Sequence, residues 1–379
     1  MDLRSLPPEL NAQERCDERR KRVEVELSMS LAHLATDGTR IGHADERNCE
    51  QMIGSVPLPV GIAGPLLVTV SDGSKMNILL PLATTEGALV ASANRGCKAV
   101  TNSGGVRTES IIVGTSRSLA FNIGGDGIAF EKILRDRSAE WIAIAEATSS
   151  HLKVLSFTID LDAPYLFLTI ACDTGEAMGM NMVTIAGDAV GQWIEKELPE
   201  AQFITVAGNV DSDKKPSLRT YEEGRGIEVT ATAWINAKTI EEVLKSNVEA
   251  MLQVADAKLT HGSQVAGSIG SNLHAANIIA AMYLATGQDA AHVVEGSLAD
   301  TLVEEKDGGI QMIVRLPALL VGVRGGGIDL PGQKQCLDLL LKGESSLNKK
   351  TQLAEVIAAG VLAGELSLLA AQASHDLGS

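Results

Sequence analysis

The segment from residue 109 to residue 206 alternates short strand-like runs with longer helix-like runs. The strand-like runs are 110–113, 154–159, 165–172 and 202–206, and the helix-like runs are 127–147 and 178–198. Two helices against four short strands predict a compact α+β sandwich of ferredoxin-like type. Because 379 residues exceed what one hydrophobic core usually serves, we expect this unit to be one of two or three domains.

The flanking segments are expected to be more helical. A small N-terminal helical region is predicted over residues 1–45, with a helix from 11 to about 34. Strands at 66–70 and 76–80 are predicted to pair across Asp72-Gly73-Ser74, whereas 56–61 is too rich in proline for a central strand. Further helices are predicted at 238–259, 273–286 and 351–377, and a strand at 311–316.

Composition excludes several classes of partner. The chain is 45% hydrophobic but only 3% aromatic, so its core is built from aliphatic side chains. A net charge of −16 argues against nucleic-acid and anionic-membrane binding. The five scattered cysteines form no CxxC pair, which indicates reduced thiols and no zinc site. Because no uninterrupted apolar run reaches about twenty residues, we expect a cytoplasmic protein without a membrane partner. From the cysteine pattern we also expect no metal.

The stretch from Pro81 to Arg107 concentrates candidate chemistry. Glu86 precedes a helix-like segment from about 87 to 100, on which Ser92, Asn94 and Arg95 lie off the apolar stripe. A capping carboxylate followed by an ordinary amphipathic helix would explain this pattern. The grouping of acid, arginines, amide and hydroxyl also suits a ligand that carries both carboxylate and phosphate.

Three other segments are candidates for function. The glycine-bearing helix start after Thr174-Gly175-Glu176 could hold a phosphate, and the polar loop 207–226 is either solvated or functional. The glycine run at 325–327 is not GxGxxG, so a Rossmann site is not supported. Asp289 follows the C-terminal end of an apolar helix, where a carboxylate is unfavourable unless a cation pairs with it.

Taken together, these segments resemble the 3-hydroxy-3-methylglutaryl-coenzyme A (HMG-CoA) reductase family, in its eukaryotic and archaeal class. The matching strings include VPLPVGIAGPLL, ATTEGALVASANRGCKA, GEAMGMNM, DKKPS, EGRG, HAANI, ATGQDAA and AGELSL, in the family's order. The resemblance implies a large substrate domain (46–108 and 218–379), an inserted cofactor domain (109–206) and a catalytic loop (207–217). It also implies a homodimer with active sites between subunits. Two hydrides from NADPH or NADH would convert HMG-CoA to mevalonate and free coenzyme A, without a metal.

The resemblance also assigns roles to residues. Lys214 matches the lysine that faces the developing oxyanion, Asp289 the acid that keeps it charged, and Glu86 a glutamate that burial would hold partly protonated. Residues matching positions for the hydroxymethylglutaryl group or coenzyme A are Ser92, Asn94, Arg95, Arg107, Asp213, Lys215, Lys258, His274 and Asn277. Residues matching the cofactor site are Ser149, Asp173, Glu176, Met178, Gly179, Met180, Asn181, Gly325, Gly326 and Gly327.

The sequence departs from the family pattern at Ala207, where a serine is usual, and at its end. The family's catalytic histidine would fall at position 381, beyond Ser379, and His375 is expected to be an ordinary histidine at a helix end. These departures leave a non-catalytic acyl-CoA-binding homologue as the alternative, and predict slow reduction by this chain compared with one extended past Ser379.

Cofactor preference is a further departure. Ser149-Ser150 stands where NADPH-using members have Ser-Arg, and Asp173 replaces another arginine. Although His151 and Lys153 lie nearby in sequence and Arg324 adds a cation beside the second cofactor loop, we expect NADH to serve at least as well as NADPH.

Overall fold

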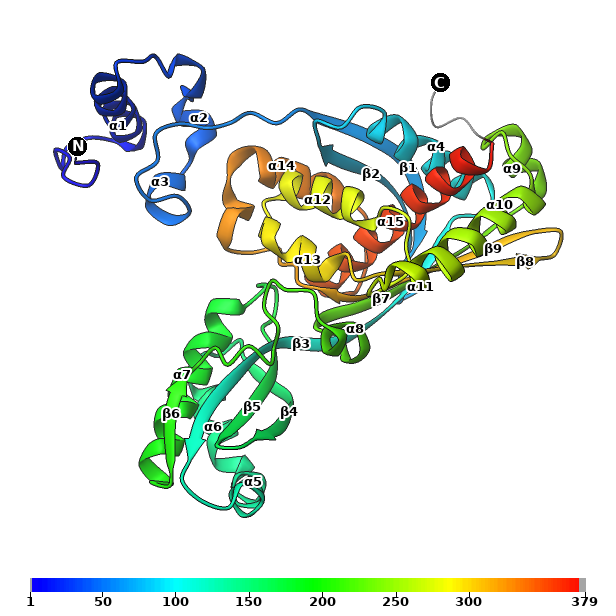
Figure 1. The fold of residues 1–379 in the computed structure, drawn as a ribbon. Coiled ribbons are helices and arrows are strands. Elements are labelled where there is room, and N and C mark those ends of the chain that lie inside the picture. Colours follow the sequence, from blue (N-terminus) through cyan, green and yellow to red (C-terminus); the bar gives the residue numbers. More distant parts are fainter. Residues whose placement is uncertain (1, 375–379) are drawn as a thin grey trace.

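One strand, β3 (Val106–Ile123), belongs to two groups of strands. The computed structural model describes residues 2–374, and Figure 1 shows β3 passing from the upper body of the molecule into the lower one. The partners change at Gly114, where φ is +103° and an added Cβ would lie 2.9 Å from the amide nitrogen of Cys172. Only glycine fits this crossing without displacing its neighbour. Only residues 110–113 of this strand were predicted from the sequence.

The upper body contains a sheet in the order β2-β1-β3-β7-β9-β8. Its other strands are β1 (Val60–Thr69), β2 (Lys75–Ala83), β7 (Gly226–Ile235), β8 (Asp300–Lys306) and β9 (Gly309–Leu319). The hairpin predicted across Asp72-Gly73-Ser74 is confirmed, with Val68 opposite Met76. β9 confirms the strand predicted at 311–316, whereas β7 and β8 were not predicted.

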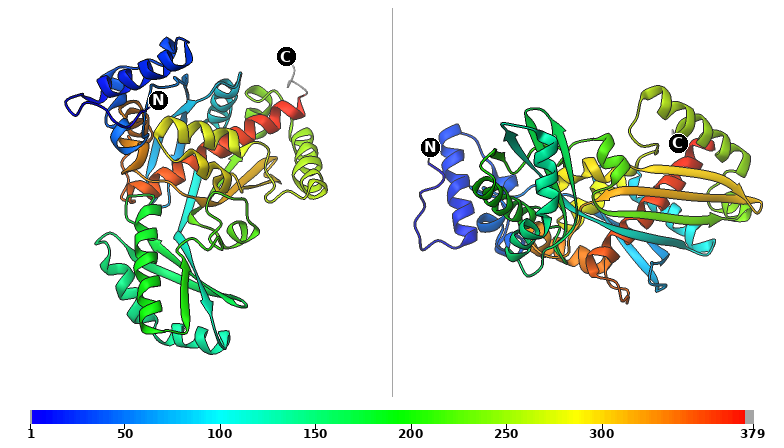
Figure 2. Two further views of the ribbon diagram at one scale, coloured as in Figure 1. Left: turned by 60° about the vertical axis from the view of Figure 1, so that its left-hand side comes forward. Right: turned by 90° about the horizontal axis from the view of Figure 1, so that it is seen from below.

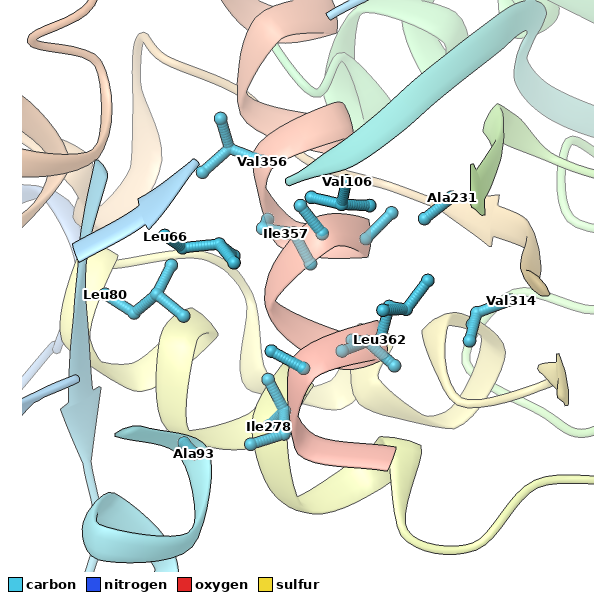
Figure 3. Packing of buried hydrophobic residues seen from close by; sticks show 14 of the residues in the cluster. Leu66, Leu80, Ala93, Val106, Ala231, Ile278, Val314, Val356, Ile357 and Leu362 are labelled. Atoms are coloured by element: carbon cyan, nitrogen blue, oxygen red, sulfur yellow. The ribbon is translucent and has the colours of Figure 1, made fainter. Parts of the chain in front are cut away.

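A long C-terminal helix, α15 (Lys349–Ala373), forms the centre of the upper core. Figure 3 shows its Val356, Ile357 and Leu362 among aliphatic side chains of the sheet and of the helices around it. It is long and apolar enough to cross a membrane, yet 94% of its most apolar window is buried inside the protein. A helix that is apolar on all sides is stable in water only when it is enclosed in this way.

Helices α4 (Leu89–Asn102), α10 (Val248–Ala255) and α12 (Ala275–Thr286) surround α15. α4 approaches it closely at Gly96, where an added Cβ would lie 1.8 Å from the carbonyl oxygen of Ala363. α4 and α12 confirm two predicted helices with shifted ends. The predicted end of α15 at Leu377 lies outside the described residues.

The lower body has a core of its own, centred on Leu119, Phe121, Trp141, Leu168 and Val190. Its strands run in the order β6-β3-β5-β4 and all pair antiparallel. The elements besides β3 are α5 (Gly127–Asp136), α6 (Ser138–Ala147), β4 (Lys153–Asp162), β5 (Tyr165–Asp173), α7 (Met180–Glu197) and β6 (Ala201–Thr205). The single helix predicted over 127–147 is wrong, because the chain turns at Arg137 between α5 and α6. Figure 2 shows this body beyond one end of the upper one.

The N-terminal region is held together by a small cluster of Cys16, Ile41, Ala44 and Met52. Helix α1 (Ala12–Leu27) begins with a capping box between Asn11 and Glu14. The prediction that it reaches residue 34 is wrong, since Ser28 adopts a left-handed conformation (φ 50°) and ends the helix. A 3₁₀ turn (Ala32–Leu34), α2 (Gly38–Ile41) and α3 (Ala44–Arg47) follow.

The predicted helix 238–259 is also wrong as one element. It comprises α9 (Ala237–Glu242), then a break at Lys245 with φ 56°, then α10, which Asn247 caps, and a π-helix (Asp256–Gly262). The remaining elements are α8 (Leu218–Glu223), α11 (Ser263–Ala266), a 3₁₀ turn (Ala290–His292), α13 (Val293–Gly296), a 3₁₀ turn (Gly326–Asp329) and α14 (Pro331–Leu340).

Candidate active site

The loop after β6 brings Lys214 against Asp289, as the sequence predicted. The ammonium nitrogen of Lys214 lies 2.8 Å from Oδ2 of Asp289. The backbone of Lys214 is left-handed, with φ 59°, and its N–H donates to Oε1 of Glu295 at 2.5 Å. Both ends of this lysine, its ammonium and its amide, are therefore held by carboxylates.

Asp289 is not the unfavourable helix-end acid that sequence analysis expected. It is the N-cap of the 3₁₀ turn Ala290–His292 and accepts the N–H of Ala291 at 3.0 Å. Burial acts to raise the pKa of Asp289, but the hydrogen bonds from Lys214 and from this N–H outweigh it and lower the pKa. In the single chain this pair is only partly buried, because the Lys214 and Asp289 side chains are 42% and 37% exposed.

A buried group of charged side chains lies behind the pair. Arg225, only 2% exposed, donates to Oδ1 of Asp213 at 3.1 Å and to Oε1 of Glu295 at 2.9 Å. Arg117 lies 3.3 Å from both Asp211 and Asp213. Burial acts to raise the pKa of Asp213, yet Arg225, His292 and Arg117 hold it below its usual value.

Five members of this group were not predicted as site residues, namely Arg117, Asp211, Arg225, His292 and Glu295. Arg225 stands in the EGRG string and Glu295 lies near ATGQDAA, so their positions were visible. Their burial, and hence their pairing, depends on contacts between distant segments, for which the sequence carries no local signal.

A cavity of about 910 Å³ lies between the two bodies. It gathers most of the predicted cofactor residues, namely Ser149, Met178, Gly179, Met180, Asn181, Gly325, Gly326 and Gly327, together with Asp289. The two predicted cofactor loops are joined because Ala177 and Arg324 form a parallel bridge and the N–H of Val323 donates to the carbonyl of Glu176 at 2.9 Å.

Glycine is required where the first of these loops turns into α7. Gly179 has φ +94°, and a Cβ there would lie 2.4 Å from the side chain of Thr174. The backbone can therefore come close to a ligand at the N-terminus of an 18-residue helix, where unpaired N–H groups favour an anion.

Two predicted cofactor residues point elsewhere. Asp173 lies 3.6 Å from the ammonium of buried Lys350 and accepts the N–H of Gly175 at 3.0 Å. Glu176 pairs with Arg324 at 2.5 Å. Neither acid lines the cavity, whereas Arg47, Asn48 and Gln333 do and were not predicted.

A second cavity, of about 700 Å³, gathers Glu86, Ser92, Arg95 and His274. Nδ2 of Asn277 lies 3.3 Å from Oε1 of Glu86 and 3.3 Å from Nδ1 of His274. The predicted burial of Glu86 is wrong in the single chain, where this residue is exposed.

α15 supports this cavity from beneath. The guanidinium of Arg95 donates to the hydroxyl and the carbonyl of Ser367 at 3.0 and 2.9 Å, and the hydroxyl of Ser92 donates to the same hydroxyl at 3.0 Å. Glu365, fully buried, accepts the backbone N–H groups of Leu273 and His274 at 2.7 and 2.6 Å.

The other predicted substrate residues are dispersed. Arg107 is exposed on β3 and Lys258 is exposed on the π-helix. Oδ1 of Asn94 accepts the N–H of Gly64 at 3.0 Å, and the ammonium of Lys215 donates to the carbonyl of Asp213 at 2.9 Å. His375 lies outside the described residues.

The two cavities lie at opposite ends of α12. His274 and Asn277 are at its N-terminus, whereas Leu284, Gly287, Gln288 and Asp289, at and beyond its C-terminus, line the other cavity. At 1.5 Å per residue, about 14 Å of helix axis separates Asn277 from Thr286. One chain therefore does not bring Glu86 to Lys214.

The fold is α+β, and the site places a lysine–carboxylate pair beside a cavity that opens on a helix N-terminus, an arrangement that suits an enzyme with an anionic ligand. The chain belongs to the hydroxymethylglutaryl-coenzyme A reductase family, whose model matches residues 15–379. It is 39% identical over 367 residues to the 3-hydroxy-3-methylglutaryl-coenzyme A reductase of Methanocaldococcus jannaschii, covering 95% of this chain and 90% of that one. It is 40% identical over 383 residues to that of Haloferax volcanii, covering 100% and 94%.

The fold is similar to that of the NADPH-bound class II reductase of Streptococcus pneumoniae in open conformations. The TM-score is 0.70 at 22% identity, and the match covers 94% of this chain and 96% of that one. At this identity the likeness concerns the fold.

Proposed function

We propose that this chain reduces HMG-CoA to mevalonate and free coenzyme A with two hydrides from a nicotinamide cofactor. The observation that carries the proposal is the 2.8 Å pair of Lys214 and Asp289, because Asp289 also lines the cavity formed by the two glycine loops. Reduction of a thioester places negative charge on its carbonyl oxygen, and an ammonium beside the hydride donor stabilises that charge.

The remaining roles follow from chemical type. Asp289 keeps Lys214 charged. Glu86 supplies a proton to the alkoxide that the second hydride transfer forms. Ser92, Arg95, His274 and Asn277 receive the coenzyme A arm and the thioester. A second set, Asn94, Arg107, Asp213, Lys215 and Lys258, is proposed to complete the substrate site, with its cations facing the hydroxymethylglutaryl carboxylate.

The cofactor is proposed to lie in the 910 Å³ cavity. Met178, Gly179, Met180 and Asn181 are proposed to contact the phosphate groups of the nicotinamide cofactor, since the left-handed Gly179 opens the start of α7 to an anionic group. Ser149, Gly325 and Gly326 line the same cavity and are proposed to contact the cofactor as well. The bound group supplies hydride, and the chain's own residues orient it and stabilise charge.

The domain boundaries are proposed as 1–45, 46–108 with 218–379, and 109–206, with residues 207–217 as the catalytic loop. The ferredoxin-like assignment of the inserted domain is supported by its order of elements, a strand, two helices in place of one, two strands, a helix and a strand. The antiparallel order β6-β3-β5-β4 also fits that topology. We propose a cytoplasmic location.

We further propose that the active unit is a homodimer with sites between subunits. About 14 Å of α12 separates the Glu86 side of the site from the Lys214 side in one chain, and a second copy would bring the complementary half. The outer face of the upper sheet also carries exposed apolar side chains, Val60, Ile62, Ile111, Trp234 and Leu302, which such a partner would cover.

An absorbance assay tests the reaction. Purified protein is given HMG-CoA with NADPH or NADH, and loss of cofactor absorbance is compared with release of free thiol. Two cofactors oxidised per thiol released support the proposal. If a chain that binds coenzyme A oxidises neither cofactor, the non-catalytic acyl-CoA-binding alternative is favoured instead.

Two variants sharpen this assay. Lys214→Ala is expected to lower turnover about a hundredfold or more, because the oxyanion loses its cation. Lys238→Ala is the control, since Lys238 is 78% exposed and lies on α9, away from both cavities. Near-normal turnover by Lys214→Ala would contradict its role.

Mixing tests the shared site. Glu86→Gln and Lys214→Ala are each expected to be inactive, but a randomly reassembled mixture contains mixed dimers with one intact site. Such a mixture should recover about a quarter of wild-type activity. A mixture as inactive as its components, although mass measurement shows mixed dimers, would refute a site built from two subunits.

A further inference from the structure

His292 lies fully buried between two carboxylates that the site already uses. Its Nδ1 is 3.4 Å from Oε1 of Glu295, and its Nε2 is 3.8 Å from Oδ2 of Asp289. Within residues 2–374, Nε2 of His292 and Oε2 of Glu295 have no hydrogen-bond partner. A buried polar atom without a hydrogen-bond partner destabilises the folded state, so these two unpartnered atoms need an explanation.

Both carboxylates hold Lys214. Asp289 pairs with its ammonium, and Glu295 accepts its backbone N–H. The left-handed backbone of this lysine is unfavourable for a residue with a side chain, and persists only where its surroundings fix it. His292 is the side chain that contacts both of these acids.

Charge balance favours an imidazole that carries both protons. Among residues 2–374, the ion-paired group contains four carboxylates (Asp211, Asp213, Asp289 and Glu295) but three permanent cations (Arg117, Arg225 and Lys214). A neutral imidazole can donate from one nitrogen, and an imidazolium from both. The imidazolium would thus serve both acids and supply the missing positive charge.

The other groups around His292 do not supply this charge. Asp213 approaches from the catalytic loop, and Tyr283 approaches Glu295 from α12. Burial, followed by the charge of Glu295, raises the pKa of Tyr283 far above its usual value, so the phenol stays neutral. Asp213, His292 and Glu295 are also metal-ligand types, but Arg225 already pairs with both carboxylates.

We propose that His292 is a positioning residue for the reduction. As an imidazolium it bridges Asp289 and Glu295, and so fixes the ammonium and the backbone of Lys214 where the oxyanion forms. This inference rests on the proposed function. It assigns to His292 an effect on turnover and not on the binding of substrate or cofactor, which other residues contact.

The test compares His292→Leu and His292→Gln with wild type, using His33→Gln as the control because His33 is exposed in the N-terminal region. The Leu variant should lose about tenfold or more in kcat, while KM for HMG-CoA and for the cofactor stays within about twofold. The kcat of the Gln variant, whose amide can donate to one acid, should lie between those of wild type and the Leu variant. If the Leu variant does not fold, the Gln variant alone tests the proposal.

A pH profile separates positioning from simple packing. The ratio of wild-type to His292→Gln kcat should change with pH, because an imidazole can carry a second proton and an amide cannot. A ratio that does not vary with pH would overturn the bridge, as would kcat within twofold of wild type or a change confined to KM. If wild type itself oxidises no cofactor with HMG-CoA, the proposed function fails instead.

Discussion

Removal of the Glu365 carboxylate should destabilise the protein by an amount that can be worked out from its contacts. Glu365 is fully buried and accepts hydrogen bonds from the amides of Leu273 and His274 and from the hydroxyl of Thr301 at 2.6–2.7 Å. In Glu365→Leu the hydroxyl can turn to another acceptor, but the two amides cannot. A stranded buried donor costs about 1–3 kcal/mol, so the expected loss is about 2–6 kcal/mol.

The expected shift in melting temperature follows from chain size. Unfolding entropy is about 2.1 cal/mol/K per residue, or about 0.8 kcal/mol/K for this chain, so Tm should fall by about 3–8 °C. Circular dichroism on heating measures it. Glu365→Gln, which keeps one carbonyl acceptor, should lose roughly half as much.

Glu241→Leu provides the control, because Glu241 is an exposed glutamate on α9. Its Tm should stay within about 1 °C of wild type. If Glu365→Leu also melted within 1 °C of wild type, the buried amides would have found other partners and the reasoning from stranded donors would be wrong.

Three further outcomes are expected. NADH should give a kcat/KM at least equal to that of NADPH at fixed low salt, because Ser149-Ser150 carries no arginine; a tenfold NADPH preference would refute this and point to Arg47 or Arg324. Burial lowers the pKa of Lys350 below its ordinary value of 10.5, so the folded state disfavours the charged form. Wild-type Tm relative to Lys350→Met should therefore rise as pH increases toward 10.5, and a constant difference would contradict this. Exposed Cys49 should react with a thiol reagent at pH 8, whereas buried Cys97, its pKa raised to about 12 by burial, should stay unlabelled until the protein unfolds.

Local signals predicted the elements they define. The turn Asp72-Gly73-Ser74 fixed the first hairpin, and the apolar stripe predicted α4. β7 was missed although Ile227, Val229, Ala231 and Ala233 alternate with polar residues, the pattern of a half-buried strand. β8 carries mostly polar residues on an edge and offers little such signal.

The candidate site was likewise predicted only where a sequence string carried the signal. Lys214, Asp289 and the two cofactor loops stand in family strings, and the structure brings them together. Arg225 and His292 matter through burial and pairing that only distant segments create. The exposure of Glu86 could not be predicted, because it depends on what covers this surface.

The crossing of β3 at Gly114 has a mechanical consequence. Beyond this glycine the strand extends to Ile123, which at about 3.3 Å per residue is an arm of about 30 Å. A rotation of 10° about the crossing would move the far end of that arm by about 5 Å. Since the 910 Å³ cavity has walls on both sides of the crossing, its width changes with the same angle. A small rotation at this one glycine would therefore change how far the 910 Å³ cavity opens.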